Sequence, residues 1–104
     1  MPHKRYEILL PEQYNDGTDI EPEKFGITKD DLLSKFGAVS VEDLKVSGLW
    51  YYQGTPHTDT LQKWWVDVAD TKENYEFLKE FKGVLRERFK QHEIWMIATS
   101  IELV

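Results

Sequence analysis

The sequence predicts an α+β fold in which a four-stranded antiparallel sheet carries two helices on one of its faces. Elements typical of strand, helix, strand, strand, helix and strand follow one another along the 104 residues. Each expected helix has one apolar stripe and therefore needs one covering surface. The length is that of one ordinary domain, so residues 1–104 are expected to form a single domain.

The first strand is expected from Arg5 to Leu10, a short and mostly apolar run. It should end at Pro11, because proline has no N–H to donate to a neighbouring strand. Residues 12–26 are polar and carry turn signals, so we expect an exposed loop there. Ile20 and Phe25 are the residues expected to hold this loop against the core.

The two helices are predicted from their start signals and apolar spacing. The first is expected to open at Thr28, whose hydroxyl can cap the first turn, and to end at a left-handed Gly37. The second is expected over residues 72–91, with Asp70 or Thr71 as its cap. The apolar stripes are Leu32, Leu33 and Phe36 in the first helix and Phe77, Leu78, Phe81, Val84, Leu85 and Phe89 in the second.

Residues 44–70 have the composition of a β-hairpin. Their flanks are rich in β-branched and aromatic residues, and the break at residues 54–57 (Gly-Thr-Pro-His) is expected to form the loop. Residues 38–41 are expected to begin the first hairpin strand, with a bulge or bend at Glu42-Asp43. A last strand is expected over residues 93–103.

This order of elements is that of the ferredoxin-like βαββαβ sandwich. The strands of residues 44–53 and 93–103 should lie at the edges of the sheet, with the first and third strands in the middle. Trp64-Trp65 and the run from Trp50 to Tyr52 do not alternate apolar with polar residues. They therefore place large apolar groups on both faces of the sheet. The two helices can cover one face, and something else must cover the other.

Four stretches of the chain are similar to known sequences: YEILLPEQYNDG, IEPEKF, ITKDDLLSKFG and the closing RERFKQHEIWMIATSIELV. Together they resemble a family of small uncharacterised bacterial proteins. The likeness covers most of the chain, but its motifs are structural and imply no activity and no catalytic residue. The resemblance implies a bacterial, cytoplasmic source.

Composition excludes several classes of function. The formal net charge of −6 argues against nucleic-acid binding, because contacts with phosphates supply most of that affinity. The chain has no Cys, which excludes disulfides and thiolate chemistry and fits a reducing compartment. We expect no signal peptide and no membrane-spanning helix, and the cytoplasm is the expected location.

Two clusters of polar residues are candidate sites of chemistry. His57 and Asp59, placed at the expected hairpin tip, could form a general base or half of a metal site, although an ordinary turn is the favoured interpretation. Glu7 and Asp67 could bind a metal or act as acid and base, but an ion pair with Lys63 is favoured. His92 is interpreted as the end of the second helix. We predict no metal and no cofactor.

The uncovered sheet face is the candidate functional surface. Its residues are predicted to include Tyr51, His57, Asp59, Leu61, Lys63, Trp65, Asp67 and Trp95. Alternation assigns Trp64 to the core, together with Val66 and Val68, and Trp65 to the functional face.

Three occupants of this face are considered, because an apolar patch of several hundred Å² is unusual in a monomer. The favoured one is a second copy of the chain, most simply in a homodimer. The second is an apolar small molecule, as in cofactor-free enzymes of the dimeric ferredoxin-like barrel type. The third is another protein with a basic surface.

Overall fold

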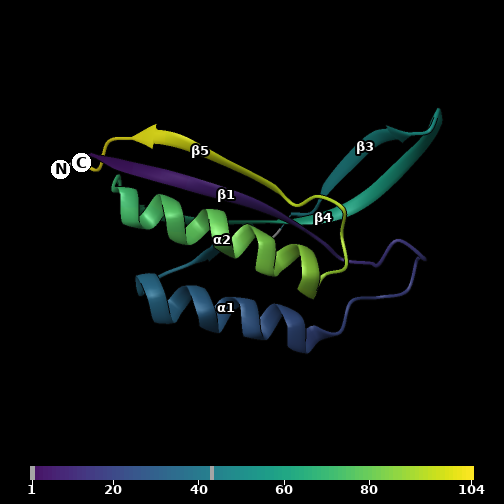
Figure 1. Cartoon of the computed structure of the whole chain (residues 1–104), viewed down its shortest axis with the longest axis horizontal. Helices are drawn as coiled ribbons and strands as arrows, with labels where there is room; N and C mark the ends of the chain where they lie inside the picture. The colour runs from purple at the N-terminus through teal and green to yellow at the C-terminus, as the bar shows by residue number, and fades with distance from the viewer. Residues whose placement is uncertain (1, 43) are drawn as a thin grey trace.

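The computed structural model describes residues 2–42 and 44–104 and confirms the predicted α+β, ferredoxin-like class (Figure 1). The elements of the described chain are β1 (His3–Pro11), α1 (Pro22–Phe36), β2 (Ser40–Val41), β3 (Val46–Tyr52), β4 (Thr55–Ala69), α2 (Lys72–Arg88) and β5 (Trp95–Ile101). All strand pairs are antiparallel, and both helices lie on the same side of the sheet.

The sheet has the order β2-β4-β1-β5, and β3 extends it by pairing with the outer part of β4. The first and third predicted strands, β1 and β4, lie in the middle as expected. The sheet has five strands instead of four because the predicted second strand is divided. Val41 of β2 faces Trp64, whereas Val46 of β3 faces Leu61, so the register changes between them. The bend expected at Glu42-Asp43 lies partly outside the described residues, which do not include Asp43.

The core lies between one sheet face and the two helices. Trp64 is 4% exposed there, and Val66 and Val68 are buried beside it, as alternation predicts. The buried apolar residues are Tyr6, Ile8 and Leu10 of β1, Trp64, Val66 and Val68 of β4, Leu32 of α1, Leu78, Phe81 and Leu85 of α2, and Ile20, Phe89 and Ile94 of the connections. Ile20 holds the loop after β1 to this core, as predicted. Phe25 also packs against the core, but it does so from α1 and not from the loop.

Helix α1 begins at Pro22, six residues before the expected start at Thr28. The prediction of a loop up to residue 26 was wrong, because proline fits the first helical position, where no N–H is needed. Thr28 is buried inside the helix and donates its hydroxyl to the Lys24 carbonyl (2.8 Å). The same hydroxyl accepts a hydrogen bond from Arg88 of α2 (2.9 Å), which joins the two helices.

Helix α2 is capped by Thr71, one of the two expected residues, whose hydroxyl accepts from the Asn74 N–H (3.1 Å). Asp70 instead forms an ion pair with Lys4 (3.7 Å). The helix ends at Arg88, so residues 89–91 of the predicted span are not helical. No described helix has the length and apolar character needed to cross a membrane.

The β3–β4 hairpin projects from the sandwich as an arm formed by residues 46–60 (Figure 1). Its turn is Gln53-Gly54, with φ of 51° and 77°, so the predicted loop at residues 54–57 was wrong. Two positive φ values define the two-residue turn whose twist suits a hairpin. Pro56 fits within β4 opposite Tyr51, since alternate residues of an antiparallel pair direct no N–H to the partner strand.

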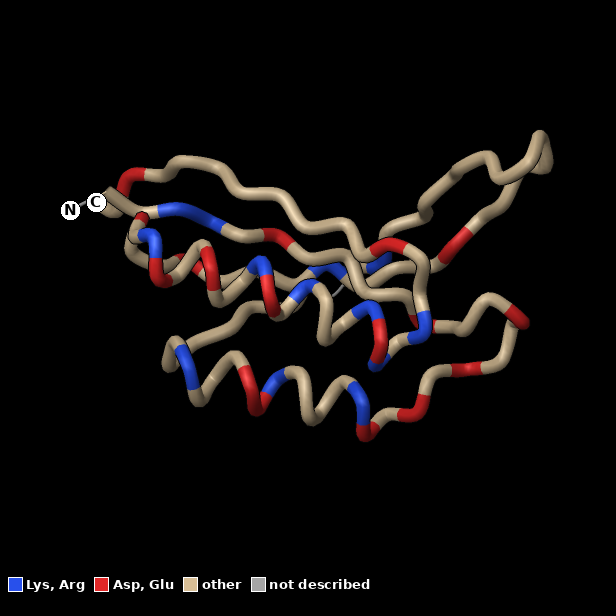
Figure 2. The backbone as a smooth tube through the Cα atoms, viewed as in Figure 1, with Lys and Arg blue, Asp and Glu red and all other residues tan. Residues whose placement is uncertain are grey.

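Charge is distributed unevenly over the backbone. Both helices carry interspersed acidic and basic residues, whereas the arm is almost uncharged (Figure 2). Its single charged residue between positions 46 and 60 is Asp59.

Candidate binding groove and open sheet face

The open face is defined here as the sheet face opposite the helices. Strand register places Glu7 of β1 between Trp65 of β4 and Ile97 of β5 on this face. Trp95 is 59% exposed, and Ile97 is exposed beside it. Both apolar and charged groups therefore reach the surface on this face of the sheet.

Trp65 lies between two cations of its own chain. The Arg5 guanidinium is 5.3 Å from the Trp65 ring centroid and the Lys63 ammonium is 5.8 Å from it. Arg5 donates two hydrogen bonds to Asp67 (2.8 and 3.0 Å), and these raise the pKa of Arg5 above its ordinary value. Lys63 pairs with Glu7 at 3.5 Å. Cation–π contacts of this kind stabilise the half-buried ring in one position.

This geometry distinguishes between the two interpretations of the predicted carboxylate pair, a site of chemistry and an ion pair. Glu7 and Asp67 do share the open face, but each has its own cation, which agrees with the ion-pair interpretation of Lys63. Among the described residues, no group of three or more His, Asp or Glu side chains is arranged to hold a metal ion.

The open face continues onto one side of the arm. Trp50 of β3 stacks on His57, its cross-strand partner, with ring centroids 4.5 Å apart and planes at 19°. The Trp50 indole N–H donates to Asp59 Oδ2 at 2.7 Å. Tyr52 lies next to Trp50 and stacks on His92 (6.3 Å, 13°), which follows α2. Residues far apart in the sequence thus form one aromatic wall.

A groove of about 350 Å³ lies between this wall and the segment that leads into β5. Its lining includes Leu9, Trp50, Tyr52, Asp59, Leu61 and Trp95. A second hollow of about 260 Å³ adjoins it and contains Tyr14, His57 and Thr60. The two hollows share Asn15, Trp50, Tyr52, Asp59 and His92, so we treat them as one feature and call it the aromatic groove.

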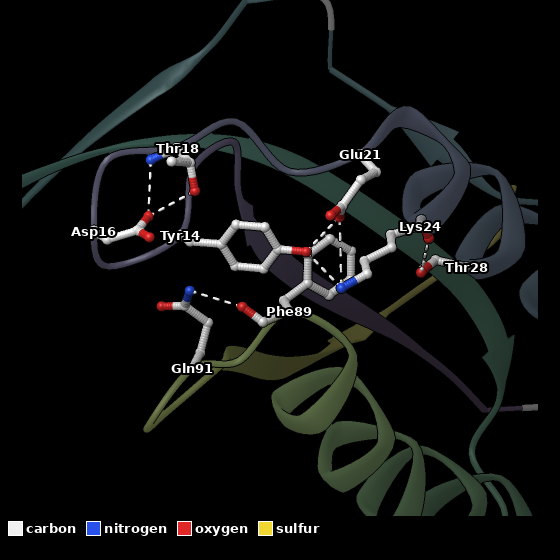
Figure 3. Close-up of polar contacts among 8 residues, drawn as sticks. All are labelled: Tyr14, Asp16, Thr18, Glu21, Lys24, Thr28, Phe89 and Gln91. Carbon is white, nitrogen blue, oxygen red and sulfur yellow. Dashed lines mark hydrogen bonds and ion pairs between the residues drawn. The ribbon is translucent and has the colours of Figure 1, made fainter.

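The loop that bounds the groove is fixed by Tyr14 (Figure 3). The Tyr14 hydroxyl donates to Glu21 and accepts from Lys24. The Tyr14 hydrogen bond lowers the pKa of Glu21 and raises the pKa of Lys24. Lys24 and Lys90 also lie 4.9 and 5.4 Å from the Tyr14 ring centroid. Asn15, which follows Tyr14, is therefore held at the edge of the groove.

Comparison with solved structures finds proteins with the same architecture. CutA1 from Oryza sativa has a TM-score of 0.68 at 11% identity, with 100% of this chain and 84% of that chain covered. The divalent cation tolerance protein from Thermus thermophilus also has a TM-score of 0.68, at 14% identity over 98% and 86% of the two chains. The fold is that of CutA1 proteins.

A phage SAM lyase, solved in complex with S-methyl-5′-thioadenosine, has the same fold. Its TM-score is 0.68 at 15% identity, with 97% of this chain and 90% of that chain covered. Identities this low show common architecture alone. No protein-family model and no curated protein sequence matches the chain.

The resemblance to uncharacterised bacterial proteins was wrong. The structural neighbours include named CutA1 and CutA proteins, and these come from a plant, a bacterium and the archaeon Archaeoglobus fulgidus. Motifs that maintain a fold, such as a turn or an apolar stripe, do not identify a family. The predicted bacterial origin therefore does not follow from these motifs.

On this CutA1 fold the predicted site residues fall into three places. Asp59, Leu61, Trp95 and His57 line the aromatic groove. Lys63, Trp65 and Asp67 belong to the open face of the sheet. Tyr51 lies on the opposite side of β3 from Trp50 and is 77% exposed, so it does not contribute to the groove.

Sequence reasoning missed Trp50, Tyr52 and His92 as groove residues. Trp50 and Tyr52 alternate with Tyr51, so a correctly placed turn at Gln53-Gly54 would have identified their common side. His92 was assigned to a helix end, but α2 stops four residues earlier. No local signal in the sequence brings His92 to Tyr52, because that contact depends on where the arm lies.

Proposed function

We propose that this chain is a self-associating binding module whose copies meet over the open face and the arm. The observation that carries the proposal is a series of large side chains that the described chain leaves uncovered. These are Leu49, Trp50, Tyr51, Tyr52, Trp95 and Ile97. Trp50, Tyr52, Trp95 and Ile97 lie on the open face, and Leu49 and Tyr51 lie on the other side of the arm. Exposed apolar surface of this extent is typical of interaction sites.

A homodimer is the simplest assembly that would cover this surface. Strand β5 pairs only with β1 within the described chain, so its outer edge can pair with another strand. An apolar open edge invites such pairing. A two-fold arrangement would satisfy both the edge and the face, because each copy offers the same surface.

Light scattering after size exclusion tests the proposal. We expect the wild type to have the mass of a dimer at tens of micromolar. Leu49→Ser and Ile97→Ser should shift it towards the monomer without unfolding it, because both side chains are exposed. Tyr75→Ser removes an exposed large side chain from α2 and is the control, which should remain dimeric. A monomeric wild type would contradict the proposal and favour a partner of another kind.

A second candidate is a small-molecule site, which would make the chain an enzyme or a ligand-binding protein. The aromatic groove supports it, since the larger of its two hollows, of about 350 Å³, falls in the range of ligand pockets. The phage SAM lyase of the same fold is described in complex with S-methyl-5′-thioadenosine. Titration of this compound against Trp fluorescence tests binding, and no saturable change would argue against that ligand.

We also propose a cellular location and a domain organisation. The absence of Cys supports the cytoplasm, whereas one CutA structure of the same fold is described as periplasmic. Cell fractionation of the native protein distinguishes the two compartments. We also propose that residues 1–104 form one domain, and a single cooperative thermal transition by two probes would support this.

A further inference from the structure

The aromatic groove has an unusual charge balance. Its lining contains two carboxylates, Asp59 and Glu93, and no Lys or Arg among the described residues. Glu93 is neutralised by Lys82 at 2.9 Å, which lowers the pKa of Glu93. Asp59 is half-buried, and within the described chain no Lys, Arg or His forms an ion pair with it. The groove thus contains one negative charge without a counterion from its own chain.

The carboxylate of Asp59 is held in place by the wall of the groove. Its Oδ2 accepts the indole N–H of Trp50, and Trp50 is itself stacked on His57. This arrangement fixes the direction of the carboxylate and keeps it beside the aromatic rings. A neutral amide at position 59 could accept the same bond, so the charge is not needed for the Trp50 contact alone.

Three aromatic rings of the groove, those of Trp50, Tyr52 and Trp95, also lack cations from the described part of the chain. Other rings have cations from the chain itself: Arg5 and Lys63 lie over Trp65, and Lys24 and Lys90 lie over Tyr14, which lines the second hollow of the groove. Over the described residues, no Lys or Arg lies against the ring faces of Trp50, Tyr52 or Trp95. These three rings are exposed and gather around the unpaired carboxylate.

We infer that the aromatic groove binds a small organic cation, of the quaternary ammonium type, with its charge beside Asp59. Electron-rich ring faces with a nearby carboxylate are the recognised chemistry for such ligands, and an onium group loses little on leaving water. The inference rests on the proposal that the groove is a small-molecule site. It adds the sign of the charge on the ligand and the residue that recognises that charge.

A pair of ligands that differ in charge alone tests the inference. Choline and 3,3-dimethyl-1-butanol have nearly the same shape, but the second is neutral. We would titrate each at constant ionic strength and follow the NMR signal of the Trp50 indole N–H, which reports on the Asp59 contact. Choline should bind at least about fivefold more tightly than the alcohol, as expected for a partly desolvated cation–π site.

Variants identify the residue that recognises the charge on the ligand. Asp59→Asn keeps an acceptor for Trp50, and it should reduce the preference for choline to less than about twofold. Asp30→Asn, on the exposed surface of α1, changes the net charge equally and should leave the preference intact. Tyr52→Leu should weaken choline binding without affecting folding, because Tyr52 is exposed. Thermal melts confirm that each variant is folded.

The outcomes separate the two proposals. Equal affinity for choline and the alcohol would overturn the cation inference while leaving a small-molecule groove in place. Saturable binding of S-methyl-5′-thioadenosine without binding of choline would also overturn the cation inference and leave a small-molecule groove in place. If choline does not bind and Asp59→Asn dissociates the oligomer, the counterion of Asp59 belongs to a second copy, and the inference fails.

Discussion

Trp64 and Trp65 are adjacent in the sequence but have opposite environments. Trp64 is buried under the helices, where Phe25 stacks on it and its indole N–H donates to Gln62 (3.0 Å). Trp65 faces outwards between Arg5 and Lys63. A single strand places them on different faces because successive side chains alternate.

Replacing Trp64 by Ala should therefore lower the free energy of unfolding by about 3–5 kcal/mol, the usual cost of deleting a large core aromatic. Trp65→Ala should lower it by about 1 kcal/mol, from loss of two exposed cation–π contacts. Urea denaturation of both variants measures the difference. A larger loss for Trp65→Ala would mean that the assignment of the two faces is inverted.

The Tyr14–Glu21 hydrogen bond makes stability depend on pH. It lowers the pKa of Glu21 from its ordinary value of 4.5, so the folded state binds this proton less readily than the unfolded state. The contribution of the bond is then fully present above pH 4.5 and is lost as the pH falls through the lowered pKa.

We expect the melting temperature of the wild type to fall as the pH is reduced below 4.5, and Glu21→Gln to flatten this dependence. Glu23→Gln, two residues further along, removes an exposed carboxylate that makes no such bond to Tyr14 and serves as control. Identical pH profiles for wild type and Glu21→Gln would contradict this origin of the effect. Calorimetry from pH 3 to pH 6 covers the relevant window.

At the scale of elements, the arm depends on its two-residue turn. Gly54 has a φ of 77°, a conformation that side chains rarely adopt. Gly83 lies within α2 without positive φ, and a Cβ there would meet nothing within 4 Å. The same substitution should therefore have opposite effects at the two sites.

Gly83→Ala should raise the free energy of unfolding by about 0.5–1 kcal/mol, since alanine reduces the entropy of the unfolded chain. Gly54→Ala should instead destabilise the arm by about 1 kcal/mol and speed amide exchange in β3. Hydrogen exchange of Trp50 and Tyr52 separates local from global loosening. Unchanged exchange in Gly54→Ala would show that the turn does not limit the stability of the arm.

The sequence allowed prediction of the strands and helices better than of their ends. Apolar spacing located α2, and alternation located Trp64, because both report on contact with one core. The start of α1 and the turn of the arm were misplaced, since Pro22 and Pro56 usually mark breaks but fit here at a helix start and a strand position. The groove could be predicted only in part, because its shape depends on how the arm lies against residues 91–95.

At the scale of the whole molecule, net charge opposes the proposed self-association. Each copy carries −6, yet the surface expected to form the contact is mostly apolar. Salt should screen the repulsion and leave the apolar contribution, so association should tighten between roughly 0.05 and 0.5 M NaCl. Sedimentation equilibrium measures this trend. Weaker association in salt would instead indicate ion pairs across the interface.

Strand β4 belongs both to the centre of the sheet and to the wall of the groove. Its first residues pair only with β3, whereas those from Leu61 onwards pair with β1. The arm is thus joined to the sandwich in two places, through β4 at Leu61 and through the stacking of Tyr52 on His92 next to the turn. A change in the position of the arm requires the Tyr52–His92 contact to break or β4 to bend near Leu61, two residues from Lys63 and four from Trp65.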